Sequence, residues 1–316
     1  MTTDSTTAQW PELPYAAWSD TCATLHLWTQ VVGKIRLAQT PWLNHSWHVP
    51  LYLTARGLTT SPIPYGPRVF EIQFDFVAHE LAIDVSDGQS RCLPLRPQSV
   101  ADFLASLMQR LSELGITIAI DELPSEIAGA VPFNRDHQHA AYDAAYAHRF
   151  WRVLSQSDRV LKQFRTGFIG KSSPVHFFWG GFDLAVTRFS GRAAPPFPGK
   201  VPGLAAAVMR EAYSHEVSSA GFWPGGNGID YPAYYSYAYP TPAAFREMPV
   251  QPAAAFFSDA LGEFLLPYEA VRTAPTPDAT LLAFLQSTYE AAAQSAAWDC
   301  AVLECARGQP RVPRSV

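Results

Sequence analysis

The sequence of 316 residues lacks the marks of several common protein classes. Lysine and arginine number 23 against 28 acidic residues, giving a formal charge of −5 with no basic stripe. A nucleic-acid partner is therefore not expected, because phosphate backbones are bound through clustered positive charge. No apolar run approaches the roughly 20 residues of a membrane span, and residues 1–15 carry no basic segment followed by an apolar one. We expect a soluble cytoplasmic protein with no membrane partner.

Cysteine is scarce, and its spacing carries no metal or disulfide signature. The four cysteines, Cys22, Cys92, Cys300 and Cys305, form neither a CxxC pair nor a zinc-binding pattern, so four reduced thiols are expected. Hydrophobic side chains are abundant, at 48% of all residues, with 13% aromatic. A chain of this length and composition can bury a sizeable core and suggests about two domain-sized units.

The order of short matching segments indicates an internal duplication. Four pairs match in the same order: 16–28 with 140–151, 45–57 with 176–191, 70–76 with 215–223, and 93–111 with 266–293. The outer pairs have the periodicity of helices and the inner pairs that of strands. The expected fold class is α+β, with two similar halves, each an antiparallel sheet flanked by helices.

The same matches suggest where the halves begin and end. We expect a first half at 1–121, a linker at 122–139, a second half at 140–305 and a flexible tail at 306–316. The second half carries two insertions, a proline-rich one at 193–203 and a tyrosine-rich one at 224–242. Loops of such composition are often binding loops or lids.

One strand-like stretch, VHFFWGGFDLAVTRFSG at 175–191, sets His176, Asp183 and Arg188 among apolar residues. If Gly180 and Gly181 form a two-residue turn, Phe178 lies opposite Asp183 and His176 shares their face of the hairpin. His176 and Asp183 are then diagonal neighbours whose side chains can meet.

Two charged pairs recur in both halves and are predicted to be structural. Arg56 matches Arg188, and Glu71 matches Glu216. A pair present twice is more typical of the fold than of chemistry, so we expect buried ion pairs between Arg56 and Glu71 and between Arg188 and Glu216.

The position of Glu216 also places its neighbour. Adjacent strand residues point to opposite faces, so His215 is expected on the side of His176 and Asp183. The first half has Phe70 where the second has His215, which confines the expected site to the second half.

His176, Asp183 and His215 are therefore the candidate catalytic residues. Two histidines and a carboxylate suit one zinc or iron ion with open coordination positions, as in a metal-dependent hydrolase or oxygenase. The same three could instead form a metal-free acid–base site, or His176 and Asp183 could be a hydrogen-bonded pair in a core. The first functional hypothesis is a small-molecule enzyme.

Aromatic residues suggest two alternatives. A cleft between the halves could hold an apolar or aromatic ligand without catalysis, through Trp47 and the candidate ligand-binding residues Trp179, Trp223, Tyr235 and Tyr237. An exposed tyrosine-rich loop could otherwise serve as a partner surface. A polar stripe of His26, Gln30 and Lys34 on the first helix is typical of a solvated face, although it could line such a cleft.

Several longer motifs carry a resemblance that covers nearly the whole chain, from about Trp10 to Glu304. The stretches WPELPYAAWSDTCATLHLWTQVVGKIRL, SPVHFFWGGFDLAVTRFSGR, AYSHEVSSAGFWPGG and YYSYAYP resemble an uncharacterised bacterial family known as a domain of unknown function. The resemblance implies a single-family chain rather than a fusion. It brings no activity, cofactor or catalytic residue.

Overall fold

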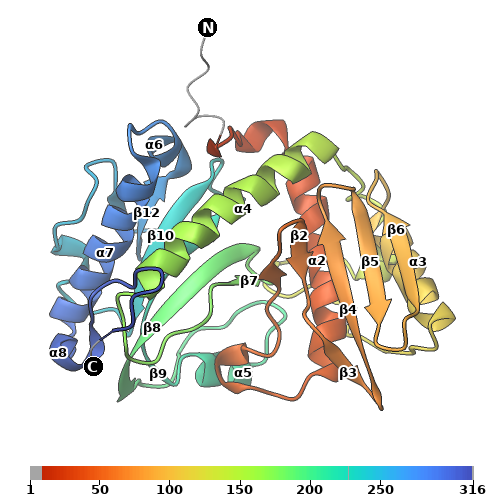
Figure 1. The fold of residues 1–316 in the computed structure, drawn as a ribbon, viewed down its shortest axis with the longest axis horizontal. Coiled ribbons are helices and arrows are strands. Elements are labelled where there is room, and N and C mark those ends of the chain that lie inside the picture. Colours follow the sequence, from red (N-terminus) through yellow and green to blue (C-terminus); the bar gives the residue numbers. More distant parts are fainter. Residues whose placement is uncertain (1–8, 227, 315–316) are drawn as a thin grey trace, which may run out of the picture.

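The computed structural model describes residues 9–314 apart from residue 227, and these form two antiparallel sheets with helices packed against them (Figure 1). The predicted α+β class with two sheet-containing halves is confirmed. Within the described residues, no helix combines the length and the apolar character needed to cross a membrane.

The first half is built from the following elements: η1 (Tyr15–Ala17), α2 (Ser19–Gln39), η2 (Asn44–Ser46), β1 (Tyr52–Leu53), β2 (Gly57–Thr59), β3 (Ile63–Tyr65), β4 (Arg68–Asp75), β5 (Glu80–Val85), β6 (Ser90–Pro94) and α3 (Val100–Glu113). Its sheet has the order β1-β2-β4-β5-β6, with β3 also pairing with β4. The helices α2 and α3 pack against this sheet.

After η3 (Phe133–Arg135), the second half comprises α4 (Ala144–Arg165), β7 (His176–Phe178), β8 (Asp183–Ala193), α5 (Ala206–Ala212), β9 (His215–Trp223), β10 (Ala233–Tyr239), η4 (Phe245–Glu247), β11 (Phe256–Ser258), β12 (Glu263–Pro267), α6 (Tyr268–Arg272), α7 (Pro277–Ser295) and α8 (Cys300–Leu303). Its sheet has the order β11-β12-β10-β9-β8-β7, and α4 and α7 cover one face (Figure 1). Each sheet has six strands, but their orders differ: β3 pairs with β4 beside β2 in the first sheet, whereas β11 lies outside β12 at the edge of the second. The internal duplication stays a prediction. The proposed domain boundaries stay a prediction.

Two long helices, α3 and α4, begin where a polar side chain satisfies free backbone amides. The Asp143 carboxylate accepts hydrogen bonds from the first amides of α4, those of Ala145 and Tyr146. Ser99 performs the same role for α3, where its hydroxyl accepts from the Asp102 amide. Such caps satisfy donors that a helix leaves unpaired at its start. Apolar residues at helical spacing in α4, including Phe150 and Leu154, are fully buried against the second sheet.

The two sheets are joined through their edge strands. Leu51, just before β1, and Phe177, in β7, exchange two backbone hydrogen bonds of 2.8 Å in an antiparallel bridge. The helix α2 makes a second junction, because the indole of Trp179 lies against Gly33. A Cβ on Gly33 would meet that ring at 2.3 Å, so only glycine permits this approach.

The expected ion pair between Arg188 and Glu216 is wrong. Arg188 faces α4, where its Nη2 donates a 2.5 Å hydrogen bond to the Phe164 carbonyl and its guanidinium lies 3.5 Å from the Phe164 ring centre. Glu216 pairs with Arg192 at 2.7 Å. The strand register explains the difference, because Arg188 lies opposite Ser218 and an irregularity between Phe189 and Ala193 displaces the strand end.

The expected pair between Arg56 and Glu71 is also wrong. Arg56 binds Asp75, because the neighbouring Gly57 is the register partner of Asp75. Glu71 lies four residues before Asp75 on β4 and accepts a hydrogen bond from Thr59. Arg56 and Arg188, which match in the sequence, therefore stabilise the fold through different partners, Asp75 and the Phe164 carbonyl.

Candidate functional site

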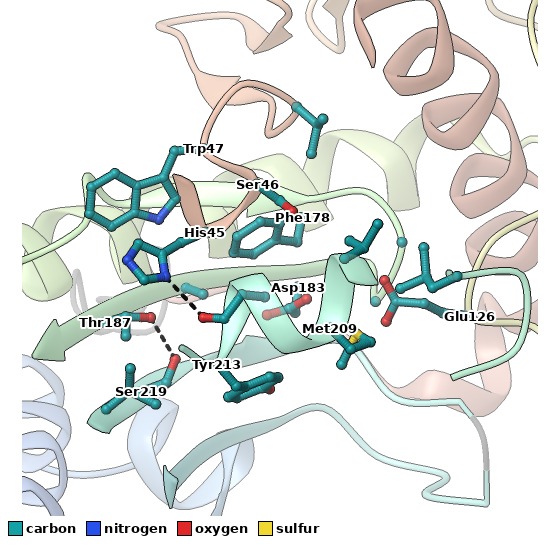
Figure 2. A pocket seen from close by; sticks show the side chains of 18 of the residues that line it. His45, Ser46, Trp47, Glu126, Phe178, Asp183, Thr187, Met209, Tyr213 and Ser219 are labelled. Atoms are coloured by element: carbon teal, nitrogen blue, oxygen red, sulfur yellow. Dashed lines mark hydrogen bonds between the residues drawn. The ribbon is translucent and has the colours of Figure 1, made fainter. Parts of the chain in front are cut away.

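A cavity of about 560 Å³ lies on the face of the second sheet that α4 and α7 leave uncovered. Residues from both halves enclose it: those around η2 from the first, and the sheet and α5 from the second. Figure 2 shows His45 and Trp47 toward one end, Glu126 at the other, and Asp183 and Met209 between them. The cleft expected between the halves is thus present.

The floor of the cavity follows from strand register. Ala185, Gly221 and Tyr235 lie side by side on β8, β9 and β10. A Cβ on Gly221 would come within 2.6 Å of the Tyr235 hydroxyl, so the glycine lets this tyrosine lie flat across the sheet. Small residues at the centre of the floor leave room that side chains would otherwise fill.

Three carboxyl groups, those of Glu126, Asp183 and Glu263, line the cavity. Desolvation raises the pKa of the Asp183 carboxyl to about 6, against the lowering effect of a hydrogen bond from Tyr235. The pKa values of Glu126 and Glu263 are raised to about 7, mainly by desolvation and secondly by the negative charge of Asp183. Glu126 is exposed where it faces the cavity, and the surrounding walls desolvate its carboxyl enough to raise its pKa.

The carboxyls of Glu126 and Asp183 meet at the tip of the β7–β8 hairpin. Oxygen atoms of the two side chains lie 3.8 and 2.6 Å from the position that a Cβ on Gly181 would occupy. A Cβ on Gly180 would come within 2.0 Å of the Glu126 carboxylate. The Gly180–Gly181 turn therefore has no side chains because two carboxyl groups occupy that space.

The polar stripe of α2 holds this arrangement in place. His26 Nε2 lies 2.8 Å from the Gly180 carbonyl, and Gln30 exchanges hydrogen bonds of 2.7 and 2.9 Å with the Ser125 backbone. Lys34 pairs with Asp121 at 3.2 Å. The stripe is therefore not a solvated face. It binds the linker and the hairpin turn that carry Glu126 and Asp183.

The opposite end of the cavity is closed by contacts between η2 and α5. The backbone amide of His45 donates to both carboxylate oxygens of Glu211 at 2.9 Å. Its ring is held by two groups, since Lys171 donates to Nε2 at 2.7 Å and Nδ1 lies 3.0 Å from the Ala212 carbonyl. Burial and the Lys171 charge lower the pKa of His45, so the ring is neutral and Nδ1 carries the proton.

The four aromatic residues singled out from the sequence, Trp179, Trp223, Tyr235 and Tyr237, all line the cavity. Trp47 does so too. The tyrosine-rich segment 224–242 is not the expected roof loop, because the part that carries Tyr235 and Tyr237 forms the central strand β10. Both side chains rise from the floor of the cavity. The roof comes from α5 and the loop before it.

The hairpin register is as predicted, but the expected three-residue centre is not formed. Phe178 pairs with Asp183 and His176 with Ala185. His176 is nevertheless fully buried away from the cavity, beside Tyr52 and Phe178, and neither ring nitrogen has a hydrogen-bond partner among the described residues. The alternative of a hydrogen-bonded His176–Asp183 pair is not found either, since Asp183 bonds Tyr235.

His215 lies on the predicted face but too far along its strand. Gly221, opposite Ala185, is six residues from His215, which corresponds to about 20 Å at the usual strand rise. His215 instead lies beside His45, with ring centres 5.9 Å apart. Among the described residues, no group of three histidine, cysteine or acidic side chains is arranged to hold a metal ion. The predicted zinc or iron centre of His176, Asp183 and His215 is therefore corrected.

Sequence reasoning missed Glu126 and Glu263. Glu126 lies in the linker, where no periodicity indicates which side chains turn inward. Its backbone has φ of 64°, a strained conformation for a residue with a side chain, and its amide donates to the Pro202 carbonyl at 2.7 Å. Glu263 starts β12, and a lone acidic residue at a strand end is ordinarily solvated. No signal in the sequence separates these two from other acidic residues.

The arrangement can bind and exchange protons. Aromatic rings and small residues supply apolar contact, and three carboxyls with raised pKa values can each hold or release a proton near neutral pH. Neighbouring hydroxyls are paired with one another, Tyr213 with Tyr237 and Thr187 with Ser219, each at 2.9 Å.

Comparison with known proteins gives a family but no function. No curated protein and no solved structure matches the chain. A family model described as a family of unknown function, DUF5996, matches residues 10–305. This agrees with the extent of the resemblance found in the sequence. The chain therefore belongs to the family DUF5996.

Proposed function

We propose that this protein binds a small, largely apolar or aromatic molecule in the cavity between its two halves. The observation that carries the proposal is the cavity itself, about 560 Å³ in volume and walled by aromatic side chains with a few convergent polar groups. Sites for small molecules have this size and this lining. The four free cysteines fit a reducing compartment, and we place the protein in the cytoplasm.

A binding assay with a neutral apolar fluorophore tests the proposal. N-phenyl-1-naphthylamine should become fluorescent when it enters the cavity. Ala185→Leu, which adds three carbons to the floor, should weaken its binding at least about tenfold, equivalent to about 1.4 kcal/mol. Ala82→Leu, on the first sheet and outside the cavity, is the matched control. Equal binding by both variants, with both still folded, would contradict the proposed site.

Acid–base catalysis is a second candidate function, favoured by one specific observation. The carboxyls of Glu126 and Asp183 share the space at the hairpin tip, and their pKa values are raised to about 7 and 6. Near pH 7 one can accept a proton while the other donates. Any turnover should then be lost in Asp183→Asn with folding intact, measured on a substrate found by screening compounds that displace the fluorophore.

A further inference from the structure

We propose that the molecule bound in the cavity is an organic cation, with its positive charge near Glu126, Asp183 and Glu263 and its apolar body against the aromatic walls. The inference rests on the proposed binding function and narrows the chemical class of the ligand. Charge, ring contacts and polar pairing in the cavity each support it.

The charge of the lining is one-sided. Three acidic side chains face the cavity, and no lysine or arginine is among the described residues that line it. Lys171 lies behind the far end of the cavity, where it donates to His45 and lies over the rings of Trp47 and Phe189. The Glu211 carboxylate binds the His45 amide at the same end. The region around Glu126 and Asp183 therefore has an uncompensated negative charge once its carboxyls ionise. A cationic ligand supplies the missing positive charge in a site of low dielectric constant, where the attraction is strong.

Within residues 9–314, leaving out residue 227, no lysine or arginine forms an ion pair with the carboxyl of Glu126 or Glu263. Only desolvation and the charge of Asp183 shift their pKa values, and both effects oppose ionisation. Figure 2 shows the Glu126 side chain pointing into the cavity toward Asp183 and Met209. The Oδ2 atom of Asp183 accepts the hydrogen bond from Tyr235, which leaves acceptor capacity on Oδ1. Desolvation opposes the ionised form of all three carboxyls, and a bound cation offsets this effect.

The walls suit a cation as well as an apolar group. Nine aromatic rings line the cavity: Trp42, Trp47, Phe178, Trp179, Phe189, Tyr213, Trp223, Tyr235 and Tyr237. Faces of such rings attract a positive charge through their quadrupole, most strongly where water is displaced. Aromatic walls together with acidic groups are the usual surroundings of alkylammonium ligands. Neutral apolar ligands use the rings but leave the carboxyls unpaired.

Binding of a cation should depend on pH because protons and the cation compete for the same carboxylates. The titratable groups that face the ligand come from every wall: Glu126, Asp183, Glu263, Tyr213, Tyr235, Tyr237, His45 and His48. The tyrosine pKa values are raised and those of His45 and His48 lowered, so these groups stay neutral near pH 7. Affinity for a cation should therefore rise as pH increases through about 6 to 7.

A pair of isosteric probes tests the inference. Benzyltrimethylammonium and neopentylbenzene have the same shape and differ in a nitrogen cation against a neutral carbon. At pH 8 the cation should bind at least about tenfold more tightly, measured by displacement of N-phenyl-1-naphthylamine. Glu126→Gln and Glu263→Gln should each weaken the cation about threefold or more and leave neopentylbenzene unchanged. Glu80→Gln, in an exposed position of the first sheet, is the matched control.

The possible outcomes separate this inference from the function on which it rests. If both probes displace the fluorophore equally, and the glutamine variants change nothing, the cation preference is overturned and the binding cavity stands. If Ala185→Leu does not weaken binding of the fluorophore, both the binding cavity and the cation preference are contradicted. A cation preference that disappears at pH 5 and in Glu126→Gln supports the inference.

Discussion

The hydroxyl of Tyr235 donates a 2.5 Å hydrogen bond to Oδ2 of Asp183, reaching from β10 to β8 across Gly221. This bond favours the ionised carboxylate and offsets part of the desolvation that raises its pKa. Asp183 is thereby kept able to ionise in a cavity that otherwise favours its neutral form.

Removing that hydroxyl should raise the pKa of Asp183. In Tyr235→Phe the carboxylate loses the hydrogen bond that lowers its pKa, so the midpoint should move above about 6. A titration followed by carboxyl-carbon NMR measures the shift. Tyr237→Phe is the control, because the Tyr237 hydroxyl pairs with Tyr213 and not with Asp183. An unchanged midpoint in Tyr235→Phe would show that the hydrogen bond does not set the ionisation of Asp183.

His176 should make the protein less stable in acid. Burial and the charges of Arg36 and Arg165 lower the pKa of its ring to about 3, whereas the unfolded chain takes up the proton near 6.5. Stability contributed by the neutral ring is therefore complete above about pH 6.5 and declines as pH falls toward 3.

The variant His176→Leu removes this proton linkage and two unpaired ring nitrogens. In urea unfolding, the free energy of unfolding of the variant minus that of the parent should become more positive as pH is lowered from 7.5 to 5. His137→Leu, in an exposed position of the linker, should show no such trend. Ligand binding should be unaffected, because His176 does not line the cavity. A parallel pH profile in parent and variant would contradict the assignment.

Double-mutant cycles should distinguish the actual partner of Glu216 from the expected one. Removing Arg192 and Glu216 singly and together should give a coupling free energy of about 0.2 to 1 kcal/mol, as for other partly exposed pairs. The cycle between Arg188 and Glu216 should give a smaller coupling, because Arg188 contacts Phe164 and Tyr289 instead. Chemical denaturation at low salt measures both cycles. Stronger coupling through Arg188 would reinstate the original pairing.

Strand periodicity made the hairpin predictable from the sequence. Two glycines between alternating aromatic residues fix a register, and the register fixes which residues share a face. Phe178 therefore lies opposite Asp183, and His215 is on the same face as both, as expected. Tyr235 and Tyr237, expected in a loop, instead lie two residues apart on β10, and both line the cavity as candidate ligand-binding residues.

Distances along the strands and contacts from the linker were not predictable in the same way. Knowing which face of a sheet two residues share does not give the distance between them along the strand. His215 therefore lies about 20 Å along β9 from Gly221, the residue opposite Ala185, and not beside His176 and Asp183 as expected. An irregularity in β8 brings Arg192, rather than Arg188, to Glu216. Glu126 enters the cavity because Gln30 binds Ser125 beside it, a long-range contact that local sequence does not encode.

The bridge between Leu51 and Phe177 has a consequence for aggregation. β1 and β7 are the edge strands of their sheets, and free strand edges offer unpaired amides and carbonyls to other chains. In this protein each edge is partly occupied by the other. Halves separated by cutting the chain in the linker would both expose such an edge, along with the apolar walls of the cavity. Because each half covers an edge strand of the other, the halves should stay in solution when joined and aggregate when separated.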